Sequence, residues 1–197
     1  MKKIVLSTMA LAIAALTFAG NGEKNTYKVD NKLSNLEWTG KKVTGEHTGT
    51  IAVKEGSIVV ENNMIKSGTI QFDMTTINCT DLEGEYKGKL EGHLKSDDFF
   101  SVEKHTASTL KIKSVKKIEG QDTYEVNGDL TIKGITHPTT FTAVIKMENN
   151  KLVAIGTVDV NRTKYDIKYG SGQFFEGLGD KMIYDDFTVK FKLGAKS

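Results

Sequence analysis

The side chains that could support catalysis or bind a metal are few and widely spaced along the chain. The four histidines, His47, His93, His105 and His137, have no zinc-site spacing relative to one another, and Cys79 is the only cysteine. The sequence contains no G-x-S-x-G motif, no P-loop and no dinucleotide-binding fingerprint. We therefore predict no catalytic residue and no metal site.

The remaining polar candidates have structural interpretations. Adjacent strand residues point to opposite faces, so Asp185 and Asp186 should not form a carboxylate pair. Arg162 is the only arginine, and we expect it to be buried and paired with Asp185 or Asp186. His93 is expected to be a buried, hydrogen-bonded side chain, and Cys79 a small apolar residue in a packed sheet.

The elements that must position these residues are mainly strands. Short β-type runs alternate with turn signals at Glu55-Gly56, Asn62-Asn63 and Asn149-Asn150. Apolar side chains occupy every second position, so each strand should have one apolar and one wet face. We predict an all-β fold, an antiparallel lipocalin-like barrel of about eight strands, with a two-sheet sandwich as the alternative.

One segment, Leu82 to Lys95, departs from the strand pattern and predicts a short helix. Its apolar side chains recur every four residues, at Leu82, Tyr86, Leu90 and Leu94. The chain should then enter a strand at Phe99 and Phe100, whose rings would face opposite sides. One ring would face the interior, and the other would pack beneath the helix against Leu90 and Leu94.

A second segment, Lys164 to Asp180, is a glycine-rich loop that carries another phenylalanine pair, Phe174 and Phe175. A long loop in a small domain is usually functional or disordered, and these aromatic residues argue against disorder. The two phenylalanine pairs could line a pocket, or they could plug the barrel ends as core. Small residues at inward positions favour a cavity: Gly128, Ala143, Ala154 and Gly156.

Residues 1–19 have the pattern of a secretory signal peptide. Lys2 and Lys3 precede an apolar run that ends at Phe18, and Ala19 suits a cleavage site. Residues 20–197 then form a single domain, periplasmic or secreted, without stable membrane insertion. The 27 basic and 25 acidic residues nearly balance, and removal of the two lysines makes them equal, so we expect no nucleic-acid partner.

Four stretches of the sequence resemble the YceI-like family, in order along nearly all of the chain after the signal peptide. They are "YKVDNKLSNLEWTGKKVTGEHTGTI", "HLKSDDFFSVEKH", "YEVNGDLTIKGITHPTTF" and "NRTKYDIKYGSG…LGDKMIYDDFTVKFKL". The resemblance implies a lipocalin-like barrel with an elongated pocket. It also implies a lipophilic ligand: a polyisoprenoid, a quinone-like lipid or a fatty acid derivative.

This resemblance makes lipid binding the leading functional hypothesis. No cofactor is expected besides the bound lipid or isoprenoid, and the sequence leaves a homodimer open. A barrel-fold enzyme acting on an isoprenoid is the alternative, and an envelope protein without ligand is the third reading. The predicted ligand contacts are Trp38, Phe72, Leu94, Phe99, Phe100, Leu130, Ile132, Phe141, Phe174, Phe175 and Phe187.

Overall fold

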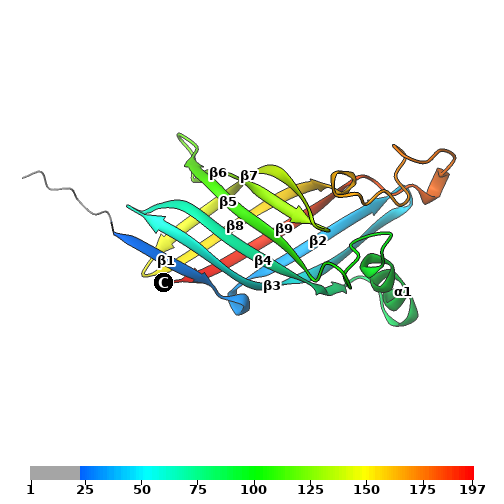
Figure 1. Cartoon of the computed structure of the whole chain (residues 1–197), viewed down its shortest axis with the longest axis horizontal. Coiled ribbons are helices and arrows are strands. Elements are labelled where there is room, and N and C mark those ends of the chain that lie inside the picture. Colours follow the sequence, from blue (N-terminus) through cyan, green and yellow to red (C-terminus); the bar gives the residue numbers. More distant parts are fainter. Residues whose placement is uncertain (1–22) are drawn as a thin grey trace, which may run out of the picture.

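Residues 23–197, the part of the chain that the computed structural model describes, contain nine strands in one closed antiparallel sheet (Figure 1). The ring closes where β3 pairs with β4, and β1 and β2 share one position between β3 and β9. This gives eight positions in the ring, which confirms the predicted barrel over the sandwich. The strands are β1 (Lys24–Val29), β2 (Asn35–Lys42), β3 (Gly45–Glu61), β4 (Met64–Cys79), β5 (Ala107–Lys117), β6 (Thr123–Ile132), β7 (Ile135–Glu148), β8 (Lys151–Asn161) and β9 (Asp186–Lys196).

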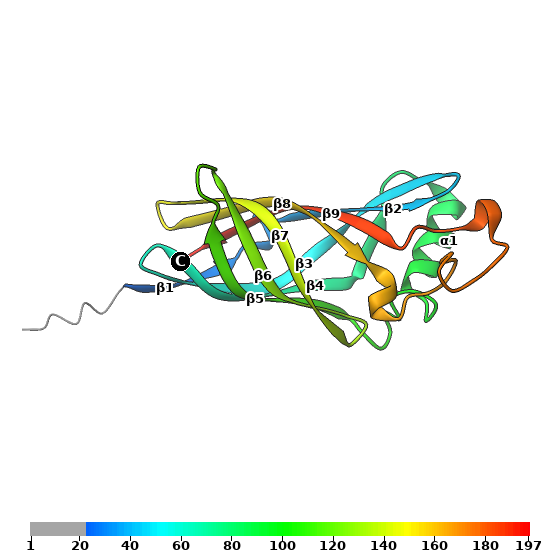
Figure 2. The same ribbon diagram turned by 90° about the horizontal axis from the view of Figure 1, so that it is seen from above.

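Helix α1 and the glycine-rich loop lie at one end of the elongated barrel, as Figures 1 and 2 both show. No helix in residues 23–197 is both long enough and apolar enough to cross a membrane. The predicted signal peptide, residues 1–19, and the first residues of the predicted domain lie outside the described residues. The helical elements are α1 (Gly84–Lys95) and the 3-10 turns η1 (Asn31–Leu33), η2 (Arg162–Tyr165) and η3 (Gly179–Lys181).

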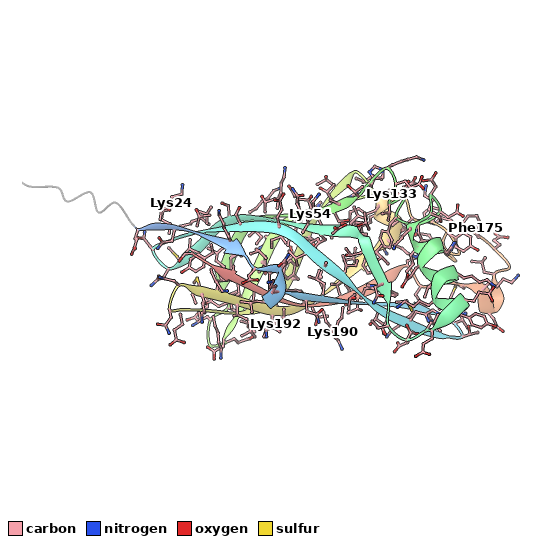
Figure 3. The ribbon with its side chains drawn as sticks, turned by 90° about the horizontal axis from the view of Figure 1, so that it is seen from below. Lys24, Lys54, Lys133, Phe175, Lys190 and Lys192 are labelled. Carbon is pink, nitrogen blue, oxygen red and sulfur yellow. The ribbon has the colours of Figure 1, made fainter. Side chains whose placement is uncertain are left out.

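The interior of the barrel follows from the alternation of side chains along each strand. On β9, Val189, Phe191 and Leu193 point inward, whereas Lys190 and Lys192 are exposed and project outward (Figure 3). The apolar side chains therefore meet in one large core, with a smaller cluster of Met74, Ile77 and Val102 beside it. Closure also leaves the described ring without a long unpaired edge, which removes a site for aggregation.

The predicted turns differ in their outcome. Asn62-Asn63 and Asn149-Asn150 each have two positive φ angles, as a tight hairpin turn requires. At Glu55-Gly56 the predicted turn is wrong, because β3 runs on as one 17-residue strand with a shift of register beside Val53. Gly56 instead allows β1 to lie close to β3, because a Cβ at this position would be 2.8 Å from Cγ2 of Val29 on β1.

Helix α1 is attached to the barrel by polar contacts as well as by the predicted apolar stripe, of which Leu94 packs against the core. None of its side chains is buried, and Tyr86 is 72% exposed. The Lys87 ammonium donates to the Asn78 side chain (2.9 Å), and the Cys79 N–H donates to the Glu91 carboxylate (2.8 Å). The helix lies across the end of the barrel against β4, so it has no broad apolar face to cover.

The residues after α1 form a compact turn, so the predicted strand at Phe99 and Phe100 is also wrong. The N–H of Phe100 donates to the Leu94 carbonyl (3.1 Å), and the N–H of Ser101 donates to the Ser96 carbonyl (2.8 Å). Ser101 has a φ of 49°, which reverses the chain. Strand β5 begins only at Ala107.

Candidate ligand-binding cavity

The barrel encloses a cavity of about 140 Å³ whose walls are almost entirely apolar. Trp38, Ser108 and Thr139 are the lining residues whose side chains contain a nitrogen or oxygen atom. No titratable side chain borders the cavity within residues 23–197. Such a space favours an apolar chain, since a charged group would lose its hydration there without compensation.

Aromatic rings narrow the cavity. Phe141 and Phe191 meet edge to face with ring centroids 5.6 Å apart. A Cβ on Gly156 would lie 2.6 Å from Cζ of Phe191, so this ring occupies the space that the glycine leaves. An engineered cavity of about 150 Å³ holds benzene, so a long chain needs these rings to turn aside.

The four small residues that favoured a cavity do not all border it. Ala143 and Ala154 are part of the lining. Gly156 is covered by the Phe191 ring, and Gly128 lies against the backbone of β5, where a Cβ would be 2.5 Å from the Lys111 carbonyl oxygen. Small inward residues thus accommodate neighbouring groups as well as empty space.

The predicted ligand contacts fall into two groups. Four of them do not line the cavity: Leu94 and Phe99 pack at its closed end, and Phe174 and Phe175 are 45% and 49% exposed on the loop. The loop lies outside the barrel and its rings turn to solvent, so the alternative that they plug the barrel end is wrong as well. Seven residues do line the cavity: Trp38, Phe72, Phe100, Leu130, Ile132, Phe141 and Phe187.

The phenylalanine pair after α1 separates as expected, although not because of strand geometry. Phe100 borders the cavity, where its ring meets Phe187 at 6.2 Å. Phe99 is buried and packs against His93 of α1 (4.9 Å) and Tyr169 of the glycine-rich loop (6.0 Å). The pair therefore joins the cavity wall to the helix and the loop.

Arg162 is buried at this end and confirms the predicted pairing with Asp185. The two side chains are 3.5 Å apart, and Arg162 is only 3% exposed. The guanidinium also donates to the carbonyls of Ile167 (2.8 Å), Ile183 (3.0 Å) and Tyr184 (3.1 Å). Burial lowers the pKa of this group and Asp185 opposes that shift. Since its donors are occupied by the protein, Arg162 fixes both ends of the loop.

A second polar cluster joins β3 to the end of β4. His47 Nδ1 lies 2.8 Å from Asp81, and the Cys79 thiol donates to the same carboxylate at 3.2 Å. Burial raises the pKa of Asp81, but hydrogen bonds from His47, Thr48 and Cys79 outweigh it and lower the pKa to about 2. Burial raises the pKa of the Cys79 thiol, which is fully buried, as expected for a packed residue.

Trp38 contributes an unpaired polar atom to the cavity wall. Its indole lies over Gly49 on β3, where a Cβ would be 2.3 Å from Cζ2. Its Nε1 is the one buried side-chain nitrogen or oxygen in residues 23–197 without a hydrogen-bond partner. An unpaired buried donor typically costs about 1–3 kcal/mol.

Sequence reasoning missed most of the aliphatic lining. The period of two along each strand would have found these residues once the inward face was known. The missed residues include Leu36, Ile51, Ile58, Ile70, Leu110 and Val126.

No group of three or more His, Cys, Asp or Glu side chains that could hold a metal ion occurs in residues 23–197.

Two solved structures share this fold. BcnA of Burkholderia cenocepacia aligns with a TM-score of 0.63 and 17% identity, over 85% of this chain and 99% of that chain. A polyisoprenoid binding domain from Saccharophagus degradans aligns with a TM-score of 0.66 and 14% identity, over 87% of this chain and 98% of that chain. At these identities the likeness establishes the barrel alone.

Sequence comparison gives the family. Protein YceI of Escherichia coli O157:H7 is 29% identical, over 97% of this chain and 91% of that protein. A UPF0312 protein of Azotobacter vinelandii is 26% identical, over the whole chain and 93% of that protein. The sequence model of the YceI-like domain matches residues 27–195, which confirms the resemblance: the chain belongs to the YceI-like family.

Proposed function

We propose that this protein is an exported binding protein that holds a long amphiphilic or apolar ligand inside its barrel. The ligand would be a polyisoprenoid, a quinone-like lipid or a fatty acid derivative, held for transport, storage or scavenging. The observation that carries the proposal is the enclosed cavity with its apolar walls. The structural neighbour from Saccharophagus degradans is described as a polyisoprenoid binding domain, which supports this class of ligand.

Export is proposed from the sequence of residues 1–19, and the site of action would be the periplasm or the exterior. An enzyme is the less supported alternative. Acid–base catalysis needs titratable groups that converge on the substrate, and the walls of the cavity in residues 23–197 carry none. The residues proposed to contact the ligand are the seven predicted ones that line the cavity.

Extraction tests the proposal most directly. Protein purified from a bacterial periplasm should release an apolar chain into organic solvent, to be identified by mass spectrometry. The delipidated protein should then bind geranylgeraniol saturably, with a change in the fluorescence of Trp38, the single tryptophan, which lines the cavity. If no lipid is extracted and neither polyprenyl nor fatty-acyl probes bind, the proposed function is wrong.

A further inference from the structure

The exposed aromatic side chains of the described residues are confined to one end of the barrel. This end carries α1 and the glycine-rich loop (Figures 1 and 2). The aromatic residues there are 45–72% exposed: Tyr86, Tyr169, Phe174, Phe175 and Tyr184. A soluble protein scatters single apolar residues over its surface, whereas a gathering of exposed aromatic rings marks an interaction surface.

The loop holds its two phenylalanines in a defined arrangement. The carbonyl of the buried residue Ser171 accepts the N–H groups of Phe174 (3.1 Å) and Phe175 (3.0 Å). The Lys168 ammonium lies 5.2 Å from the centre of the Phe174 ring. Figure 3 shows Phe175 at the tip of this end. The hydrogen-bonded main chain of the loop thus holds the rings of Phe174 and Phe175 toward solvent.

The same end is linked to the cavity by a series of aromatic contacts. Phe100 borders the cavity, Phe99 lies behind it at 6.2 Å, and Tyr169 follows at 6.0 Å, with its own ring half exposed. Turns and helical segments close the barrel here. Moving them breaks fewer ladder hydrogen bonds than separating two strands of the wall.

The charges of the glycine-rich loop argue against some classes of binding partner. Three basic and three acidic residues lie between Lys164 and Tyr184, so the loop has no net attraction for nucleic acid or for an acidic protein. Tyrosine side chains are favoured at the boundary between water and lipid. Phenylalanine is among the apolar residues that peripheral segments bury at the boundary of headgroups and acyl chains. The charged residues of the loop are Lys164, Asp166, Lys168, Glu176, Asp180 and Lys181.

We propose that this end of the barrel docks on the surface of a phospholipid bilayer, with Phe174 and Phe175 entering the headgroup region. The ligand would then pass between α1 and the loop, past Tyr169 and Phe99, without crossing water. The docking stands on the exposed rings and their arrangement, whereas the transfer of ligand rests on the proposed function.

Flotation with phosphatidylcholine vesicles tests the docking. The protein should float with the vesicles, and a Phe174→Ser/Phe175→Ser variant should bind them roughly tenfold or more weakly, because two half-exposed rings lose their contact with lipid. Binding should change little up to about 0.5 M salt, since charge is not its source. Met64→Ser and Ile155→Ser are matched controls, with exposed apolar residues elsewhere on the barrel, and should float like the unmodified protein.

Four results would overturn the docking. They are no flotation of the unmodified protein, equal flotation of the double variant, equal loss in the Met64 control, and a dimer in solution that the double variant abolishes without any vesicle binding. Geranylgeraniol titration, followed by Trp38 fluorescence, is run in parallel. Intact geranylgeraniol binding without flotation removes the docking and leaves the proposed function. Flotation of a protein that yields no extracted lipid and binds neither polyprenyl nor fatty-acyl probes removes the proposed function and leaves the docking.

Discussion

The barrel interior and the end covered by α1 are held together by different interactions. In the interior, apolar side chains of alternating strand residues meet without polar partners. At the end, Arg162 donates hydrogen bonds to three carbonyls and pairs with Asp185. The Asp81 carboxylate is hydrogen-bonded to His47, Thr48 and Cys79. Apolar packing is non-directional, so the interior can adjust to a ligand, whereas directional bonds fix the two ends of the glycine-rich loop and the junction of β3 with the end of β4.

This difference predicts that the largest loss of stability comes from the polar end. Arg162→Ala leaves the carbonyls of Ile167, Ile183 and Tyr184 without their donor and Asp185 without its partner. Breaking such a buried pair typically costs about 3–5 kcal/mol, which thermal unfolding should show as a large fall in melting temperature. Lys164→Ala, at an exposed position of the same turn, is the control. A melting temperature within about two degrees of the unmodified protein would contradict this view of the end.

The phenylalanine pair at the border between the two regions should separate stability from binding. Phe99→Ala removes a ring packed among Arg162, His93 and Tyr169, and loss of a core phenylalanine costs about 3–5 kcal/mol. Phe100→Ala truncates a ring that already borders empty space, so it should cost less stability and more ligand affinity. Chemical denaturation and geranylgeraniol titration of both variants measure the two effects. If both variants lose the same stability and keep the same ligand affinity, both rings are core residues without a role in binding.

Filling the cavity should affect binding far more than folding. Ala154→Leu adds bulk to the lining next to the cavity, so its cost in stability should lie at the low end of that for added core volume, about 1 kcal/mol. Geranylgeraniol affinity should fall roughly tenfold or more, because the chain loses volume that it would occupy. Ile155→Ala, on the outer face of the same strand, should leave affinity unchanged. Full affinity in Ala154→Leu would place the ligand elsewhere.

The smallest effect concerns acid stability at the Asp81 cluster. Its folded pKa of about 2 lies below the usual value of 3.8, so its contribution to stability is present above that usual value and is lost as the pH falls through about 2. Asp81→Asn should therefore be less stable than the unmodified protein at neutral pH, and the difference should shrink in acid. Denaturation as a function of pH measures this, with the exposed Asp122→Asn as control. If the stability difference between Asp81→Asn and the unmodified protein grows as the pH falls, folding does not lower the pKa of Asp81.

The sequence by itself determined the barrel and part of its wall. Alternation with a period of two is imposed by strand geometry, so it identified Phe72, Leu130 and Phe141 as inward residues before any contact was known. Paired asparagines located two hairpins because few other residues accept a positive φ. Arg162 could be paired with an acid in advance, since a lone buried arginine needs a partner.

Only the tertiary structure decided the course of the chain around the barrel end. The glycine of Glu55-Gly56 permits a turn as well as a close crossing, and the neighbouring Val29 on β1 selects the crossing. The four-residue stripe of α1 predicts the helix and the packing of Leu94 correctly, but not the polar contacts of Lys87 and Glu91 with β4.

The position of Phe174 and Phe175 was decided in the same way. Pocket lining and barrel plug are equally compatible with their sequence, which carries no period to assign a face. The hydrogen bonds of Ser171 and the two ends of the loop fixed by Arg162 direct the rings to solvent. Local periodicity therefore identified the residues of the barrel wall, whereas contacts between residues distant in sequence determined which side chains reach the ligand cavity and which reach the surface.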